Sequence, residues 1–218
     1  MLAVLGVPAV AAWVRRQPNG FLPVAVIRNP AVVRSALAAA AVPAAWFALL
    51  IAVPAVLVAR GWEPWQVGVA LLPSAVAALA GPRFAGPLLV RVGPTRALAL
   101  AAMIAAASLL VSALGAYSSS AWLLVTAVVG VTLAFGLGQP ALMEAVGSAV
   151  SADVRGVALG VATLFFLVGG SVGSAVVGGL GEVLGMPGAL LLLAALPVAG
   201  FVALVPLLSR DPARIPVD

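Results

Sequence analysis

All eleven basic residues of this chain are arginines, and nearly all of them lie in every second gap between long apolar runs. Arginines precede the first run and return after the second, fourth and sixth runs, whereas the gaps on the other side hold only Arg60. Cytoplasmic loops of membrane proteins are enriched in Lys and Arg. The alternation therefore predicts a polytopic membrane protein with an even number of crossings, which places both flanks of the apolar block, and the C-terminus, in the cytoplasm.

The apolar runs are long enough to span a membrane as helices. A helix needs roughly 20 residues to cross ~30 Å of hydrocarbon, and the runs lack the period-2 alternation of membrane β-strands. Apolar residues make up 64% of the chain and charged residues 8%, so lipid must solvate much of its surface. We therefore expect an all-α integral membrane protein built on a six-helix bundle, with spans at about Ser35–Ala59, Val67–Val90, Ala97–Tyr117, Ala121–Met143, Val157–Leu180 and Met186–Leu208.

Composition excludes several other classes of protein. The net charge is +5, but the arginines are dispersed among loops, whereas a surface that binds nucleic acid needs them clustered on one face. The chain has no Cys and no His, which removes thiol chemistry and the commonest metal ligands and general bases. We therefore expect no enzymatic activity, no cofactor, no metal and no nucleic-acid partner.

The N-terminal segment does not fit the pattern of full spans. Met1–Val14 is apolar, but as a helix it would be only about 21 Å long. A signal peptide has basic residues before its apolar core, and here Arg15 and Arg16 follow it. We interpret residues 1–14 as the remnant of a preceding transmembrane helix, with a native short anchor as the alternative. Residues 15–34 are then a cytoplasmic loop, residues 35–208 the bundle and residues 209–218 a cytoplasmic tail.

The connection between the second and third spans carries the most specific motif. It resembles the loop motif of the major facilitator superfamily, Gly-x-x-x-[Asp/Glu]-Arg-x-Gly-x-[Arg/Lys]-[Arg/Lys], through Gly86, Arg91, Gly93 and Arg96, with Val90 in the place of the acid. In that family the loop carries a charge relay that helps to hold the outward-facing state. From the residues alone, the glycines would permit a tight turn, and an ordinary arginine-rich loop is the alternative.

Other stretches are similar to the 14-helix drug:proton antiporters of the same superfamily. They are the Arg-Asn-Pro at residues 28–30, the Gly-x-x-x-x-Pro at 68–73, the Gly-rich residues 136–140 and the Arg-Gly at 155–156. The resemblance implies the C-terminal half of a proton-coupled multidrug exporter in a bacterial plasma membrane, and we expect this half alone not to transport. Its partners would be lipids, protons, a small hydrophobic or cationic substrate, and an N-terminal half or a second copy. The alternatives are an accessory membrane protein without transport activity and a permease for another metabolite.

The fifth span contains small residues at four-residue spacing, namely Gly169, Gly170, Gly173, Ser174 and Gly178. Such residues form a flat helix face on which a neighbouring backbone can approach closely. We expect this face to pack against another helix. Static packing and a sliding interface for alternating access are both compatible with the pattern.

Four further residues stand out within the apolar runs. Arg83 and Glu144 are ionisable, and intramembrane ionisable residues usually face a cavity or a partner. A coupling pair is one hypothesis, and snorkelling of both side chains to the cytoplasmic interface is the other. Trp46 and Gln139 are candidates for lining a substrate cavity, with core packing for Trp46 and a bond to a proline-freed carbonyl for Gln139 as alternatives.

Overall fold

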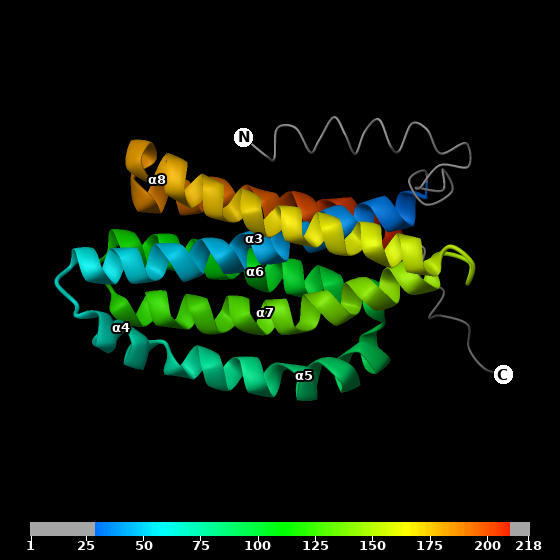
Figure 1. Cartoon of the computed structure of the whole chain (residues 1–218), viewed down its shortest axis with the longest axis horizontal. Coiled ribbons are helices and arrows are strands. Elements are labelled where there is room, and N and C mark those ends of the chain that lie inside the picture. Colours follow the sequence, from blue (N-terminus) through cyan, green and yellow to red (C-terminus); the bar gives the residue numbers. More distant parts are fainter. Residues whose placement is uncertain (1–28, 210–218) are drawn as a thin grey trace, which may run out of the picture.

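The computed structural model describes residues 29–209, and this part of the chain forms one bundle of long helices (Figure 1). In order they are α3 (Pro30–Ala59), α4 (Pro64–Ala70), α5 (Leu72–Val92), α6 (Pro94–Tyr117), α7 (Ala121–Ser148) and α8 (Arg155–Leu208). Five helical stretches are long and apolar enough to cross a membrane, with α4 and α5 counted as one. The all-helical, multi-pass expectation is therefore supported. The expected remnant at residues 1–14, residues 15–28 of the expected loop and residues 210–218 of the expected tail lie outside the described residues.

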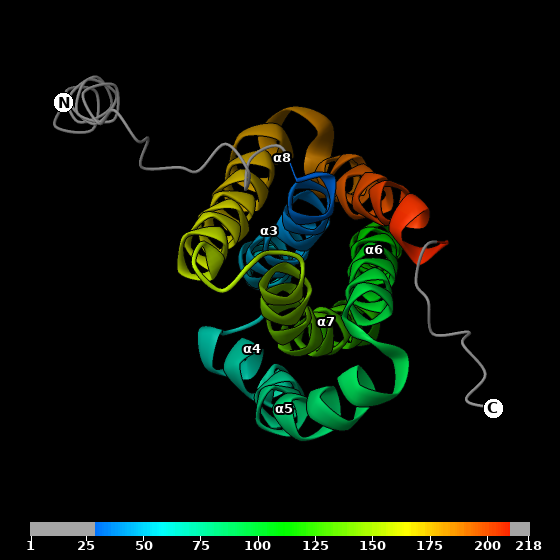
Figure 2. The same cartoon turned by 90° about the vertical axis from the view of Figure 1, so that its right-hand side faces the viewer.

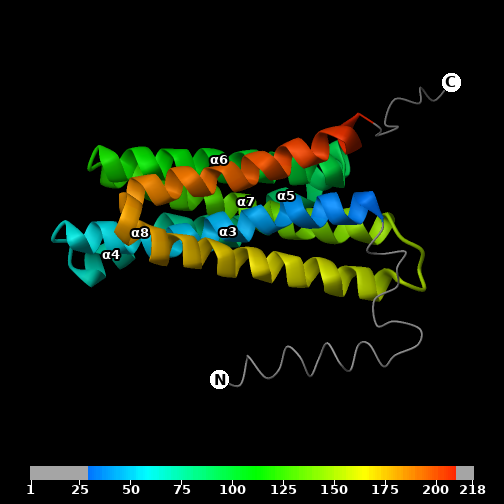
Figure 3. The same ribbon diagram turned by 90° about the horizontal axis from the view of Figure 1, so that it is seen from above.

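Helix α8 is a pair of helices joined without a loop. Its 54 residues would extend for about 80 Å, far more than one crossing requires. The helical geometry breaks at Gly185, where φ is 70° and ψ is 158°. The segments before and after this break run in opposite directions (Figure 3), and both pack against α3. We call residues 155–184 the first arm and residues 186–208 the second arm. Six apolar runs led us to expect six separate helices, whereas the structure has five continuous stretches, because the last two runs share one.

Helix α3 occupies the middle of the bundle, with α6, α7 and both arms of α8 around it (Figure 2). Its interior face is mostly alanine, and Ala38, Ala41, Ala44, Ala45 and Ala48 are completely buried. Small side chains allow neighbouring backbones to come close, which compensates in a membrane for the missing hydrophobic drive between helices. The alanine-rich composition of this run is thus what allows it to be the central helix.

Polar side chains close the helix ends. Asn29 begins α3, because its Oδ1 accepts from the N–H groups of Ala31 and Val32, and its Nδ2 donates to Ala149 O at 2.9 Å. The guanidinium of Arg60 donates to the carbonyls of Gly115 and Ala116 at the end of α6. A cation at a helix C-terminus is favourable. The one arginine in the gaps of the other side therefore has a structural role in ending α6.

The connections gather at two ends of the bundle. The start of α3 and the α5–α6 and α7–α8 connections lie at one end, while the α3–α4 and α6–α7 connections and the Gly185 break lie at the other (Figure 1).

The helix boundaries expected from the sequence were approximate. Helix α3 begins at Pro30, five residues before the expected start of the first span, and α7 continues to Ser148, five residues beyond the expected end of the fourth.

Helix α5 lies at the edge of the bundle, and α7 is its main contact (Figure 2). Only Ala77, Gly81 and Ala85 are buried on it, at a spacing of four residues. A Cβ built on Gly81 would be 3.8 Å from the Cα of Gly136, so the two backbones come close there. This crossing holds α5 against α7.

Candidate functional site

A cavity of about 490 Å³ lies between α3, α5 and α7. The three helices contribute unequally: Trp46 comes from α3, while Ala78, Pro82, Ala85 and Gly86 come from α5 and Thr132, Phe135, Gly136, Gln139 and Pro140 from α7. Trp46 and Gln139, the two residues expected to line a cavity, therefore border the same one. No acidic or basic residue is among its lining side chains.

Aromatic rings make up one wall of the cavity. The ring centroids of Trp46 and Phe135 are 4.6 Å apart, with the planes inclined at 30°. Phe47 meets Trp46 edge-on at 4.9 Å, and Phe166 on the first arm of α8 lies 5.3 Å from Phe135. Such clusters hold ring orientations through their quadrupoles. Trp46 is therefore held by other rings, as the core-packing interpretation expected, and it also borders the cavity.

The polar groups of the cavity are few and mostly acceptors. Proline has no N–H to donate to the carbonyl four residues earlier, so Pro82 and Pro140 leave the carbonyls of Ala78 and Gly136 without their usual donors. Ala78 and Gly136 both line the cavity. Thr132 donates its hydroxyl to Val128 O at 2.7 Å, which leaves its oxygen able to accept. Gln139 forms no side-chain hydrogen bond within residues 29–209, so the alternative for this residue, a bond to a proline-freed carbonyl, is not made.

Sequence reasoning missed several residues of this site. Phe135 and the Gly81–Gly136 crossing were not singled out, although the Gly81-Pro82 pair and the glycines shortly before Pro140 could have signalled a local break in helix packing. Phe135 carried no signal of its own, because one phenylalanine in an apolar run is ordinary. What selects it is its position one turn before Gln139 on α7.

The motif between α5 and α6 is only partly a turn. Gly93 ends α5 and begins α6 with φ 81° and ψ 160°, a conformation essentially restricted to glycine. Gly86, however, lies inside α5, and a Cβ built on it would meet nothing within 4 Å. The expectation that it forms part of a tight turn was wrong, since six helical residues separate it from Gly93. Arg91 and Arg96 are both exposed on either side of the turn.

Arg83 and Glu144 do not form a pair in the described part of the chain. Arg83 is two residues from Gly81, which faces α7. Two residues correspond to about 200° around a helix, so Arg83 projects away from α7 and is exposed. Glu144 instead borders a separate hollow of about 320 Å³ together with Arg155. The hypothesis of an Arg83–Glu144 pair is therefore wrong. The two residues were paired by their expected membrane depth, but their side chains point in different directions from their helices.

The small residues of the first arm of α8 divide into two groups. A Cβ on Gly169 or Gly173 would overlap the carbonyl oxygens of Ala40 and Ala44, so the α3 backbone lies directly on these glycines. A Cβ on Gly170 would be 2.6 Å from the Phe47 ring. Ser174 is half-buried and donates to Gly170 O at 3.1 Å within its own helix.

Gly178 does not belong to this packing face. A Cβ built on it would meet nothing within 4 Å, and the residue is exposed. Each four-residue step rotates the position by roughly 40° around the helix, which carries Gly178 out of contact after two steps from Gly170. The expectation that all five small residues pack against a neighbour was therefore wrong for Gly178.

Comparison with known proteins identifies one family. The model of the Major Facilitator Superfamily matches residues 36–218 of the chain. A search of the curated proteins and a search of the solved structures found no match.

Proposed function

Because the chain belongs to the major facilitator superfamily, whose members are membrane transporters, we propose that it is the C-terminal half of an exporter for hydrophobic or cationic compounds. The observation that carries the proposal is the cavity between α3, α5 and α7, with an aromatic wall and proline-freed carbonyls. A membrane-buried cavity with this chemistry suits a ligand that is largely apolar and carries a donor or a positive charge.

The chemistry of the cavity favours a lipophilic cation in particular. The faces of Trp46 and Phe135 can attract a cation within about 6 Å of a ring centroid. The carbonyls of Ala78 and Gly136 and the hydroxyl oxygen of Thr132 accept hydrogen bonds and offer partial negative charge. An anionic ligand would find as side-chain donors only the amide of Gln139 and the indole N–H of Trp46, and no basic residue among the lining side chains, so we expect anions to bind poorly.

The proposal that this unit works as one half rests on the position of the cavity. In transporters of this type the substrate site lies at the midplane between repeats that rock against each other, and here the cavity is lined by three helices of a single such unit. The first arm of α8 also exposes large apolar side chains, with Leu164 62% and Leu167 58% exposed. An N-terminal half or a second copy would supply the missing wall and cover part of this surface.

Proton coupling is assigned to Glu144 within this proposal. Of the described acids, only Glu144 lies inside a helix close to the end of the bundle where the arginine-rich connections gather. It shares its hollow with Arg155, which donates to Gly147 O at 2.9 Å. Uptake of a proton by Glu144 would change the charge of this hollow, and we infer that this links the proton gradient to rearrangement of α7 and α8.

Binding and transport test separate parts of the proposal. Tetraphenylphosphonium binding to the purified chain should weaken about tenfold in Trp46→Ala, since a desolvated cation–π contact contributes ~1–2 kcal/mol. Trp122→Ala is the matched control, because Trp122 is 83% exposed and does not line the cavity. Equal effects of the two variants would contradict the assignment of the cavity.

Transport is measured in proteoliposomes with an imposed proton gradient. We expect no efflux by monomers of this chain and efflux once a complementing half is present, lost again in Glu144→Gln. Robust proton-driven efflux by isolated monomers would refute the half-transporter proposal. Intact coupling in Glu144→Gln would refute the role of that carboxyl.

A further inference from the structure

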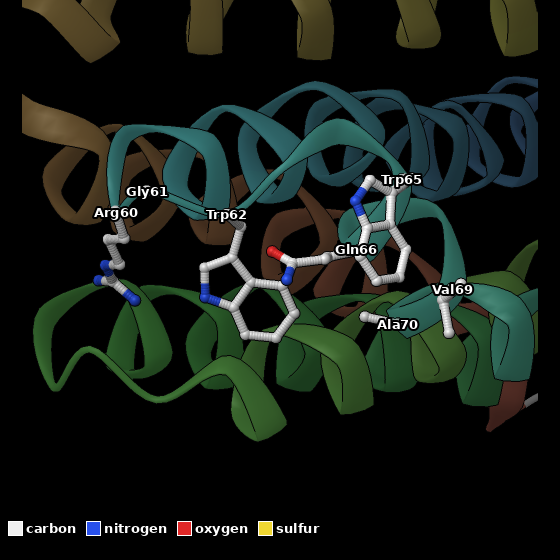
Figure 4. Close-up of a pocket in the computed structure, with 7 residues that line it drawn as sticks. All are labelled: Arg60, Gly61, Trp62, Trp65, Gln66, Val69 and Ala70. Carbon is white, nitrogen blue, oxygen red and sulfur yellow. The ribbon is translucent and has the colours of Figure 1, made fainter.

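A second hollow, of about 560 Å³, lies where α3 turns into α4. It is distinct from the substrate cavity and shares no lining residue with it. Figure 4 shows Gln66 extending toward the ring of Trp62, with Arg60 beyond that ring and Val69 and Ala70 at the opposite end. The hollow therefore has a cationic end and an apolar end.

The polar side chains of this hollow offer donors and no uncommitted acceptor. Gln66 accepts from the N–H of Glu63 at 2.9 Å through its Oε1, which leaves its amide N–H groups to donate. The indole N–H groups of Trp62 and Trp65 have no hydrogen-bond partner within residues 29–209. Arg60 caps α6 with its two terminal nitrogens, but it carries five N–H donors. A ligand that satisfies these groups must bring acceptor oxygens, and the arginine favours a negative charge.

The hollow lies at a water–lipid interface if the helices cross a membrane. Trp65 on α4, Tyr117 at the end of α6 and Trp122 at the start of α7 belong to helix ends that meet at this end of the bundle, and they are 68%, 82% and 83% exposed. Exposed tryptophan and tyrosine form belts at the headgroup level. A strip of exposed apolar residues continues from Trp65 through Val69 and Leu72 to Val76. Trp65 and Val69 are one turn apart on α4, and Leu72 and Val76 are one turn apart on α5, so each pair shares a face of its own helix. At helical rise the eleven steps of the strip cover at most roughly 16 Å, which is about one leaflet of hydrocarbon.

We propose that this hollow binds an anionic phospholipid, with the phosphate at Arg60 and the two indoles and one acyl chain along the strip from Trp65 to Val76. The phosphate and ester oxygens are acceptors only, which matches the donor lining. A zwitterionic lipid fits less well, because its ammonium group would lie near the guanidinium of Arg60, and none of the residues that line the hollow is an acid. The inference needs only that the helices cross a membrane, and it stands or fails independently of the transported compound.

The test uses the full chain in nanodiscs of phosphatidylcholine, titrated with phosphatidylglycerol, and counts retained lipids by native mass spectrometry. We expect phosphatidylglycerol to be retained preferentially and its apparent affinity to fall about tenfold in Arg60→Gln, since hydrogen bonds to charged groups contribute substantially. Arg155→Gln is the matched control, because Arg155 also caps a helix end but lies at the opposite end of the bundle. Arg60→Lys should retain part of the preference through its charge.

A second variant guards against loss of folding in Arg60→Gln. Trp65 is exposed and outside the buried core, so Trp65→Ala should fold and still reduce phosphatidylglycerol retention. Inorganic phosphate lacks the chains that would contact Val69 and Leu72, and we expect it to compete weakly. Equal retention of the two lipids, equal losses in Arg60→Gln and Arg155→Gln, unchanged retention in Trp65→Ala, or full competition by inorganic phosphate would each overturn the assignment.

Discussion

Replacing Gly173 by alanine should separate the first arm of α8 from α3. The added methyl group would overlap the carbonyl oxygen of Ala44, which is part of the α3 backbone and cannot rotate away. Overpacking of this kind costs about 1–3 kcal/mol, while the better helix propensity of alanine returns up to ~1 kcal/mol. We take the upper part of the range because both partners are helix backbones. The expected net loss is about 2 kcal/mol, or roughly a 30-fold shift toward the unfolded state.

Two neighbouring glycines provide a graded control on the same arm. Gly178→Ala adds its methyl group to open space, so it should be stabilising by about 0.5–1 kcal/mol. Gly170→Ala meets the ring of Phe47, which is 37% exposed and can move, and should fall between the other two. In the double variant Phe47→Ala/Gly170→Ala the added methyl group has no ring to meet. The stability that Gly170→Ala loses through that contact should therefore be regained. Ala44→Gly should not rescue Gly173→Ala, because the overlap is with a main-chain oxygen.

The measurement is unfolding in mixed micelles with increasing dodecyl sulfate, followed by far-ultraviolet circular dichroism. Midpoints should follow the order Gly178→Ala, Gly170→Ala, Gly173→Ala, from most to least stable. If Gly173→Ala and Gly178→Ala shift the midpoint equally, the close contact of α3 with α8 is not a determinant of stability. Rescue of Gly173→Ala by Ala44→Gly would place the clash on the side chain instead.

Three further changes have defined outcomes. Gly93→Ala should lower the free energy of unfolding by about 1–3 kcal/mol, because the φ of 81° with ψ of 160° at this position strains any residue with a Cβ. Gly86→Ala, inside α5, should not lower it. Unfolding of the two variants in dodecyl sulfate compares them directly. Asn29→Ala should cost about 1–2 kcal/mol through loss of the α3 cap, and Asn29→Ser should cost less because it keeps a capping oxygen but loses the bond to Ala149 O; unchanged thermal unfolding of Asn29→Ala would contradict the cap. The hydroxyl of Ser151 and nearby backbone N–H groups hold the pKa of Asp153 below its ordinary value of 3.8, so this carboxylate favours the folded state above that pH and the contribution is lost as the pH falls through the lowered pKa. Ser151→Ala should raise the pKa of Asp153, as carboxyl carbon chemical shifts in an NMR titration would reveal.

The sequence predicted the helices well and their rotations poorly. Apolar length alone located the long helices, because a membrane requires about 20 apolar residues wherever the chain crosses it. A pattern of residue types does not report which way a helix faces. Arg83 and Glu144 seemed a pair by depth, but the face of α5 that meets α7 is set by Gly81 and Ala85.

The same limit explains the partial success at the candidate sites. Trp46 and Gln139 could be selected because a large aromatic and an amide are unusual in aliphatic runs, and they border one cavity. Gly86 and Gly178 were selected by spacing and have open surroundings, whereas Gly93 and Gly173 are required by geometry. Spacing identifies which glycines could approach a neighbour, and only the tertiary arrangement decides which of them do.

The central position of α3 sets an order of assembly during synthesis. Its Ala40 and Ala38 rest against Gly169 and Gly200, which follow 129 and 162 positions later in the chain. At about 5–20 residues per second, α3 leaves the ribosome roughly 6–30 s before these contacts can form. During that interval its alanine face has no partner from α8 and must be solvated by lipid or by the insertion machinery. The first of the described helices to be made is thus the last of them to be enclosed, and slow translation between α3 and the end of α8 would prolong the stage at which the nascent protein is open to degradation.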